Sequence, residues 1–314
     1  MKNSKIAVLN LNPGIDRVMY LNEPLKCGCL NRSNECVLGQ GSKAANFSIM
    51  LKRLCVDVEY FSFTGGVFGE ICNSFIEKEN IKTHYVETQG GVRLNFKVVD
   101  SNGCYTEVNE KGAFVEYEEL EKLLLLVEKQ DFDIIVLCGS LPSGVEGSAY
   151  GKIIKRIRQH NENIRFILDC DGEALKQGVK AVPYLIKPNR AELCDLGQVL
   201  VTDLKTKEDA FALCRQLYHK YGVNILCTLD CDGVIYVGAE GDFSQNSIEV
   251  EAKGFNGAGD TCLAAFVFAR LYMNYEIPKS LEYCVCAAAA KVELRGSIIP
   301  QKERIDELYK IYKI

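Results

Sequence analysis

The sequence predicts an α/β fold in which a mostly parallel central sheet is covered by helices on both faces. Short β-rich runs recur at residues 6–11, 58–63, 133–139, 165–170, 184–186, 224–228 and 234–237. Stretches with apolar residues at helical spacing lie between many of these runs, at residues 44–54, 117–127, 150–157 and 210–221. This alternation is typical of parallel strands joined by covering helices. Beyond Gly259 the chain is predicted to be almost wholly helical, which closes one layer.

Two segments interrupt this pattern, at residues 16–37 and 92–111. Both alternate polar and apolar residues, contain Gly and Asn-Gly turns, and lack helical periodicity. Neither can bury a core alone, so we expect extra antiparallel strands that together form a small β lid at one edge of the sheet. No linker rich in Pro, Gly or Ser divides the chain. Residues 1–314 are therefore predicted to be a single domain with these lid segments inserted.

The composition excludes several classes of protein. With 47% hydrophobic and 25% charged residues, the chain has the balance of a soluble globular protein. No apolar run approaches the roughly 20 residues that span a bilayer, and the first residues lead into a strand and not a signal peptide. A net charge of −5 argues against broad nucleic-acid or membrane binding. An anionic ligand would need a local cluster of Lys and Arg.

The chain holds 15 cysteines and 3 histidines. The cysteine number is odd, and the residues are scattered through apolar strands and helices, which favours small buried thiols over disulfides. Cys27 and Cys29, like Cys284 and Cys286, are spaced too tightly for the usual two-residue zinc pair. We expect a reducing, cytoplasmic setting.

A glycine-rich segment at residues 255–261 stands between a strand-like run and a long apolar stretch. Its small residues leave backbone N–H groups free at a helix start, which favours an anion. Asp260 would be repelled by that anion, so its presence suggests a base that takes a proton from an attacking hydroxyl. The alternative is a helix N-cap at Asp260. The helix dipole should lower the pKa of Asp260 and make it a weak base.

Two further turns also lie at predicted strand ends or helix starts. Residues 39–46 open a helix, so their amides, Lys43 and Asn46 could hold a sugar or its phosphate. A glycine turn with a solvated lysine explains the same pattern. Ser140 follows the apolar strand at residues 133–139 and is exposed by a Gly-Ser-Leu-Pro turn, which a plain turn explains equally well.

A third cluster follows the run at residues 184–186. Asn189 and Glu192 lie one helical turn apart and can order the water shell of Mg²⁺. The alternative is a capping box, with Asn189 as N-cap. Residues 228–233 form a predicted hairpin turn, marked by Asp-Gly, that could lie along a nucleotide.

The lid segments carry the basic residues Lys26, Arg32, Arg93 and Lys97. Arg93, Asn95 and Lys97 alternate with apolar residues, so their side chains share one face of a strand. If these side chains face solvent, they are ordinary surface charges. If they face the cleft, they form a site for a sugar phosphate.

The order and spacing of the motifs along the chain are more informative than any single motif. The chain reads LNPGID at residues 11–16, NR at 31–32, GSKAAN at 41–46, RLNFK at 93–97, GSLP at 139–142, KPNRAE at 187–192 and GAGDT at 257–261. Over essentially its whole length it resembles the PfkB (ribokinase-like) sugar kinases. Within them it is most similar to the branch of 1-phosphofructokinases and tagatose-6-phosphate kinases.

This resemblance implies a ribokinase-like three-layer α/β/α sandwich with a small β-sheet lid, a homodimer formed through that lid, and ATP and Mg²⁺ as cofactors. The implied reaction is phosphoryl transfer to a hydroxyl of a ketohexose phosphate, most simply fructose 1-phosphate to fructose 1,6-bisphosphate. Tagatose 6-phosphate and fructose 6-phosphate are alternative substrates. A nucleic-acid or membrane partner is not expected.

The resemblance also implies a role for each matching residue. The catalytic base would be Asp260, with the amides of Gly257, Ala258 and Gly259 facing the transferring phosphoryl group. Sugar hydroxyls would be held by Asp16, Gly41 and Asn46, with Ser140 as a further contact. The phosphate on the sugar would be faced by Lys43, Arg93, Lys97, Lys26 and Arg32. ATP would be bound by Lys187, Thr228, Asp230, Gly233 and Gly257, and Mg²⁺ by Asn189 and Glu192 through water.

The chain departs from the family pattern at several positions. Ser42 and Ala44 replace glycines beside the sugar, Asp230 replaces a common glycine beside the nucleotide, and Cys138 replaces a serine. These changes motivate the alternative of a weakly active regulatory protein that binds sugar phosphates. A NAD-linked dehydrogenase is disfavoured, since no glycine fingerprint follows the first strand.

Overall fold

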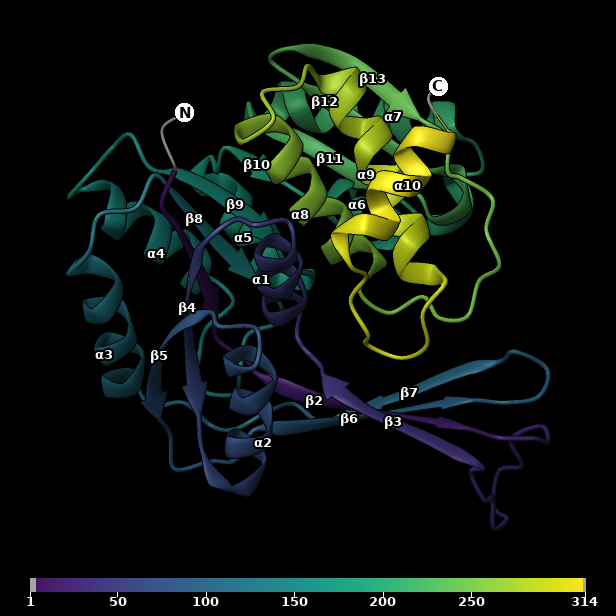
Figure 1. Cartoon of the computed structure of the whole chain (residues 1–314). Coiled ribbons are helices and arrows are strands. Elements are labelled where there is room, and N and C mark those ends of the chain that lie inside the picture. Colours follow the sequence, from purple (N-terminus) through teal and green to yellow (C-terminus); the bar gives the residue numbers. More distant parts are fainter. Residues whose placement is uncertain (1–3, 313–314) are drawn as a thin grey trace.

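Nine strands form the main sheet of the computed structural model, which describes residues 4–312. Their order across the sheet is β13-β12-β11-β10-β9-β8-β1-β4-β5 (Figure 1). The β11–β12 and β12–β13 pairs are antiparallel, and the other neighbours are parallel. The strands span β1 Ile6–Asn10, β4 Val58–Thr64, β5 Lys82–Glu87, β8 Ile134–Cys138, β9 Arg165–Asp169, β10 Leu185–Ile186, β11 Asn224–Thr228, β12 Val234–Gly238 and β13 Gly241–Gln245.

Helices cover both faces of this sheet, as the sequence predicted. Successive residues of β1 point to opposite sides: Ile6 and Val8 join one buried core, Ala7 and Leu9 the other. The first core is closed by α1 Lys43–Arg53, α8 Ala258–Leu271, α9 Ile277–Val292 and α10 Lys302–Ile311. The second is closed by α3 Tyr117–Glu128, α4 Ala149–Arg158, α5 Gly172–Gly178, α6 Arg190–Gly197 and α7 Lys207–Tyr221. The helical end of the chain is confirmed.

A separate four-stranded sheet projects from the main body (Figure 1). Its order is β3-β2-β6-β7, from β2 Gly14–Tyr20, β3 Glu35–Gln40, β6 Arg93–Val99 and β7 Tyr105–Asn109. The sequence predicted antiparallel strands here, but β2 and β6 pair in parallel. They do so because β2 follows β1 and β6 follows β5, so both leave the main sheet from the carboxyl edge of parallel strands. We call this unit the small sheet.

The sequence did not predict α2 Gly66–Glu77, α5, β5 or β13. The two strands are the edges of the main sheet and are only partly buried, so their sequences lack a continuous apolar run. The first turn of α2 carries exposed Val67 and Phe68, which blurs its helical pattern.

All fifteen cysteines are free. Cys138, Cys170, Cys227 and Cys262 are buried among apolar side chains, as predicted. Between residues 4 and 312, no helix combines the length and apolar character needed to cross a membrane.

Candidate active site

A cleft of about 1080 Å³ is lined by residues at the carboxyl edge of the main sheet and by residues of the small sheet. Ligands of open α/β sheets collect at that edge. The cleft brings together most of the residues singled out from the sequence, although they are spread over nearly 250 positions of the chain. It is lined by Asp16, Gly41, Lys43, Asn46, Lys97, Lys187, Asn189, Thr228, Asp230, Gly233, Gly257, Ala258, Gly259 and Asp260.

The glycine segment at residues 255–259, here called the anion loop, leads into α8. Gly257 is the N-cap of α8, with φ +78° and no side-chain capping bond. The Ala258 amide donates to the Phe255 carbonyl at 3.3 Å, whereas the amides of Gly259 and Asp260 have no acceptor among the described residues and stay free for a ligand. Asp260 lies inside the first turn, and the alternative in which it caps the helix is wrong. Its carboxylate accepts a hydrogen bond from Asn46 Nδ2 at 2.7 Å.

Burial raises the pKa of Asp260 to about 6, helped by the nearby Asp169 carboxylate and opposed by Lys187 and Lys43. The sequence predicted a lowered pKa from the helix dipole, and that prediction is wrong because desolvation outweighs the dipole. The raised pKa makes Asp260 a stronger base while leaving it mostly ionised at neutral pH.

Asp169, at the carboxyl end of β9, joins two lysines of the cleft. Its Oδ1 accepts from Lys43 Nζ at 2.9 Å and lies 3.3 Å from Lys187 Nζ. Its buried Oδ2 has no hydrogen-bond partner among the described residues. The sequence reading missed Asp169, although an aspartate ending a buried strand next to the strand of Lys187 was a usable signal.

Lys43 is placed differently from expectation. It was expected to face the phosphate of the sugar, but its ammonium pairs with Asp169 and with Glu192 Oε1, each at 2.9 Å. Burial lowers the pKa of Lys43, yet these carboxylates outweigh burial and hold it well above its usual range. Lys43 therefore carries a fixed charge on the side of the cleft expected to hold ATP.

Asn189 and Glu192 form the capping box weighed as the alternative. Asn189 Oδ1 accepts from the Glu192 amide at 2.8 Å, and Glu192 Oε2 accepts from the Asn189 amide at 2.9 Å. Since Glu192 Oε1 also binds Lys43, both carboxylate oxygens already have protein partners. This arrangement suits indirect contact with a metal through water better than direct coordination.

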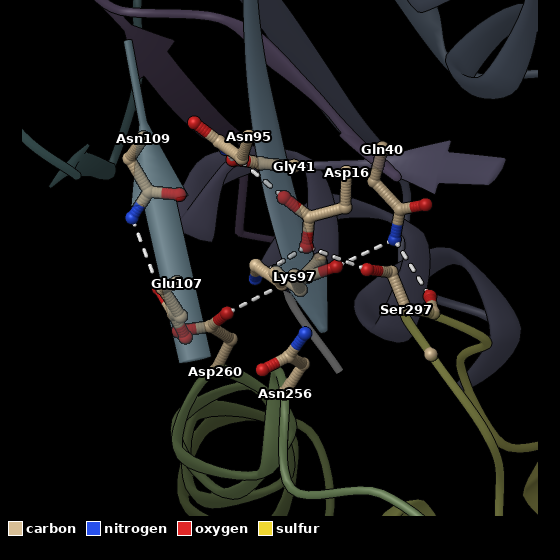
Figure 2. A network of polar contacts seen from close by, with 12 residues as sticks. Asp16, Gln40, Gly41, Asn95, Lys97, Glu107, Asn109, Asn256, Asp260 and Ser297 are labelled. Atoms are coloured by element: carbon tan, nitrogen blue, oxygen red, sulfur yellow. Dashed lines mark hydrogen bonds and ion pairs between the residues drawn. The ribbon is translucent and has the colours of Figure 1, made fainter. Parts of the chain in front are cut away.

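Asp16 is the centre of a second polar group at the base of the small sheet (Figure 2). It accepts from Lys97 Nζ at 2.7 Å, Asn95 Nδ2 at 2.9 Å and Ser297 Oγ at 2.7 Å. Asn95 and Lys97 share one face of β6, as the alternation predicted. A Cβ on Gly41 would lie 2.3 Å from Asp16 Oδ1, so only glycine allows this close approach.

A chain of hydrogen bonds links the Asp16 group to Asp260, and Figure 2 shows its first part, from Asp16 through Ser297 to Gln40. Ser297, bonded to Asp16, accepts through its backbone carbonyl from Gln40 Nε2 at 3.2 Å. Gln40 also donates to Asn46 Oδ1, and Asn46 donates to Asp260. Gln40 and Ser297 were missed because their role arises from contacts between residues more than 250 positions apart. The network therefore holds the carboxylates of Asp16 and Asp260 in place relative to each other.

Comparison with known proteins identifies the family. The model of the pfkB family of carbohydrate kinases matches residues 9–304. The chain belongs to this family. It is 32% identical to a 1-phosphofructokinase of Bacillus subtilis, over 83% of this chain and 84% of that protein. It is 28% identical to a 1-phosphofructokinase of Escherichia coli, over 92% and 91%.

Solved structures show the same ribokinase-like fold. Phosphofructokinase-2 from Escherichia coli in complex with substrates and products matches with a TM-score of 0.90 at 23% identity, covering 99% of this chain and 100% of that one. A tetrameric inhibited form of the same protein matches with a TM-score of 0.86 at 22% identity, with the same coverage. Ribokinase from Thermotoga maritima matches with a TM-score of 0.77 at 20% identity, covering 98% and 99%.

The departures from the usual pfkB sequence have small structural consequences. Ala44 is fully buried and its side chain faces the core, away from the cleft. The hydroxyl of Ser42 caps α1 and accepts from Asn10 Nδ2 at 3.0 Å. Asp230 adopts a left-handed φ of +50°, and its carboxylate is exposed, where water screens it. These positions give little support to an inactive pfkB protein.

Four predicted substrate contacts lie outside the residues that line the cleft. Lys26 is exposed and paired with Glu23, and Arg32 is exposed in the connection between β2 and β3. Ser140 accepts from Asn12 Nδ2 at 3.0 Å. Arg93 packs against Gly14, and burial lowers its pKa. Their expected roles toward the substrate stay predictions.

Ser297→Ala is expected to raise the KM for the sugar substrate about tenfold, because Asp16 loses a hydrogen bond to a charged group. The kcat should change less, since Asn46 still holds Asp260. Steady-state kinetics measure both, with Ser148→Ala on the exposed surface as the matched control. An unchanged KM would show that Ser297 does not orient Asp16.

Proposed function

We propose that the protein transfers the γ-phosphoryl group of ATP to the 6-hydroxyl of fructose 1-phosphate, giving fructose 1,6-bisphosphate and ADP. The observation that carries this proposal is the joining of Asp260, at the anion loop, to the Asp16–Lys97 pair through one continuous hydrogen-bond network. A base and a site for a charged sugar then share one cleft. Relatives named 1-phosphofructokinase support the choice of sugar.

In this mechanism each group has one task. Asp260 accepts the proton of the attacking hydroxyl, and the free amides of Gly259 and Asp260 at the start of α8 face the oxygens of the transferring group. Lys43 and Lys187 place fixed positive charge beside them. Asp16 accepts from a sugar hydroxyl, and Lys97 faces the phosphate on the sugar.

The residues present fit a magnesium ion held largely by water and phosphate. Between residues 4 and 312, no cluster of three His, Cys, Asp or Glu side chains could hold a metal directly. The unpartnered Asp169 Oδ2 and the carboxylate of Glu192 suit hydrogen bonds to its water shell, and Asn189 lines the same cleft. When bound, Mg²⁺ neutralises charge on the ATP phosphates.

ADP release measured over a panel of sugar phosphates tests the proposal. We expect fructose 1-phosphate to give the highest kcat/KM, above tagatose 6-phosphate, fructose 6-phosphate, free ribose and nucleosides. Turnover of free ribose or a nucleoside without any hexose phosphate would overturn it. A protein that binds fructose 1-phosphate but turns over none of the panel would favour the regulatory alternative.

Lys97→Met is expected to raise the KM for fructose 1-phosphate at least tenfold with a smaller change in kcat, because the cation facing the substrate phosphate is lost. Lys152→Met, at an exposed ion pair on α4, is the control and should leave both constants unchanged. Equal KM values in the two variants would place the sugar phosphate elsewhere.

We further propose a cytosolic homodimer formed through the small sheet. Leu38 on β3 and Val108 on β7 are 47% and 65% exposed, and packing against a second small sheet would remove their apolar surface from water. Free thiols suit a reducing compartment. Val108→Glu should convert the dimer into a monomer in light scattering, and a tetramer, as described for the Escherichia coli relative, would revise the proposal.

A further inference from the structure

Lys291 is a buried lysine that the proposed mechanism does not use. It lies one residue before the end of α9, and none of its surface is exposed. Its Nζ donates to the backbone carbonyl of Gly296 at 3.0 Å. Among residues 4–312, the Gly296 carbonyl is the hydrogen-bond acceptor of the Lys291 ammonium group, and no carboxylate forms an ion pair with Lys291.

Packing alone does not account for a lysine at this position. An ammonium group has three N–H donors, and burying a charge without a close partner is strongly unfavourable. A methionine would fill a similar volume without that cost. Burial lowers the pKa of Lys291 to about 8, so the group is still mostly a cation at neutral pH.

The side chain of Lys291 lies next to the anion loop. A methyl group placed on Gly257 would lie 3.6 Å from Lys291 Cε, so this side chain packs directly behind the loop. The backbone just before the loop is fixed to the same helix end, since the amides of Lys253 and Gly254 donate to the Val292 carbonyl.

The charged groups around Lys291 come from three other elements. Asp260 on α8 raises its pKa most, Asp16 on β2 also raises it, and Lys97 on β6 lowers it. Gly296, its hydrogen-bond acceptor, directly precedes Ser297, which binds Asp16. The ammonium therefore lies behind both polar groups of the cleft.

We propose that Lys291 is a positioning residue for phosphoryl transfer: its buried ammonium ion fixes the backbone that supports Gly257 and Ser297, and its charge favours an anion on the other side of the loop. This inference rests on the proposed kinase function. Lys291 does not touch substrate, so it acts through the loop and through Asp260.

The test is Lys291→Met in the full-length protein. We expect kcat to fall about 10- to 100-fold, less than for a donor that touches the transferring group, with the KM for fructose 1-phosphate within about twofold of wild type. The melting temperature should stay equal or rise, because an unpaired buried charge is removed. A residue with a merely structural role would lower it.

The pH dependence gives an independent readout. A lysine with a lowered folded pKa disfavours folding while it is charged, so the variant should gain stability below about pH 8 and lose this gain as pH rises toward the usual lysine pKa. Wild-type kcat should decline above pH 8 as Lys291 loses its proton, and that decline should be absent in the variant.

Lys279→Met, at an exposed site on α9, is the matched control and should resemble wild type. A Lys291→Met protein with wild-type kcat, or one that loses activity together with a lower melting temperature, would overturn the role of Lys291. Failure of the proposed function would look different, since wild-type protein would then turn over no sugar phosphate, while the melting temperatures of the variants would still test Lys291.

Discussion

Asp260→Asn is expected to lower kcat by about 10²- to 10⁴-fold, the usual contribution of a positioned base. Asparagine keeps the shape and the contact with Asn46 but accepts no proton. Affinity for fructose 1-phosphate, measured by calorimetry, should change little, since Asp16 and Lys97 are intact. Wild-type kcat/KM should fall below about pH 6, where Asp260 becomes protonated.

The same substitution should raise stability at neutral pH. The pKa of Asp260 is above its unfolded value, so its contribution to stability is present at low pH and lost as pH rises through about 6. A neutral asparagine avoids that loss. Asp57→Asn, at an exposed carboxylate, serves as the control. Wild-type activity in Asp260→Asn would mean that another group takes the proton.

Asp169→Asn is expected to destabilise the fold by about 3–5 kcal/mol, the usual cost of leaving buried charges without their partner. Lys43 and Lys187 would then face each other with Glu192 as the remaining counter-charge at Lys43. Chemical denaturation at pH 7 measures the loss. Kinase activity should fall as well, because both lysines lose their fixed positions.

Acid should remove most of the difference between wild type and Asp169→Asn. Burial raises the pKa of Asp169, but Lys187 and Lys43 outweigh burial and lower it, so its contribution is present above the unfolded pKa and lost as pH falls through the folded pKa. The control is Asp195→Asn, in a surface pair with Lys176, which should cost less than about 1 kcal/mol. Equal losses in the two variants would show that the buried cluster adds no special stability.

The strand-and-helix pattern was predictable where elements are long and buried. Strand β11 has the predicted bounds, and α1, α3, α4 and α7 differ from prediction by at most three residues at either end. The elements missed were the two edge strands, α2 and the short helix α5, where packing and not periodicity decides the structure. Parallel pairing of β2 with β6 depends on where each strand leaves the main sheet, which local sequence does not encode.

The candidate site divides in the same way. The anion loop, Asp16, Lys97, Lys187 and Asp260 could be read from the chain, because glycines before a helix and alternating charges on a strand carry a local signal. Gln40 and Ser297 could not, because each matters through its contact with a distant residue, whereas Asp169 at a strand end carried a local signal that was missed.

By itself, therefore, the sequence determined an α/β kinase with an anion loop at the start of α8 and a basic strand at β6. Tertiary structure alone decided that Lys43 binds Asp169 and Glu192, and that Lys26 and Arg32 lie outside the cleft. It also decided that the pKa of Asp260 rises, against the expectation from its own helix. The physical reason is that desolvation and Coulomb interactions depend on which charges surround a group in space, and neighbours in the chain are only some of them.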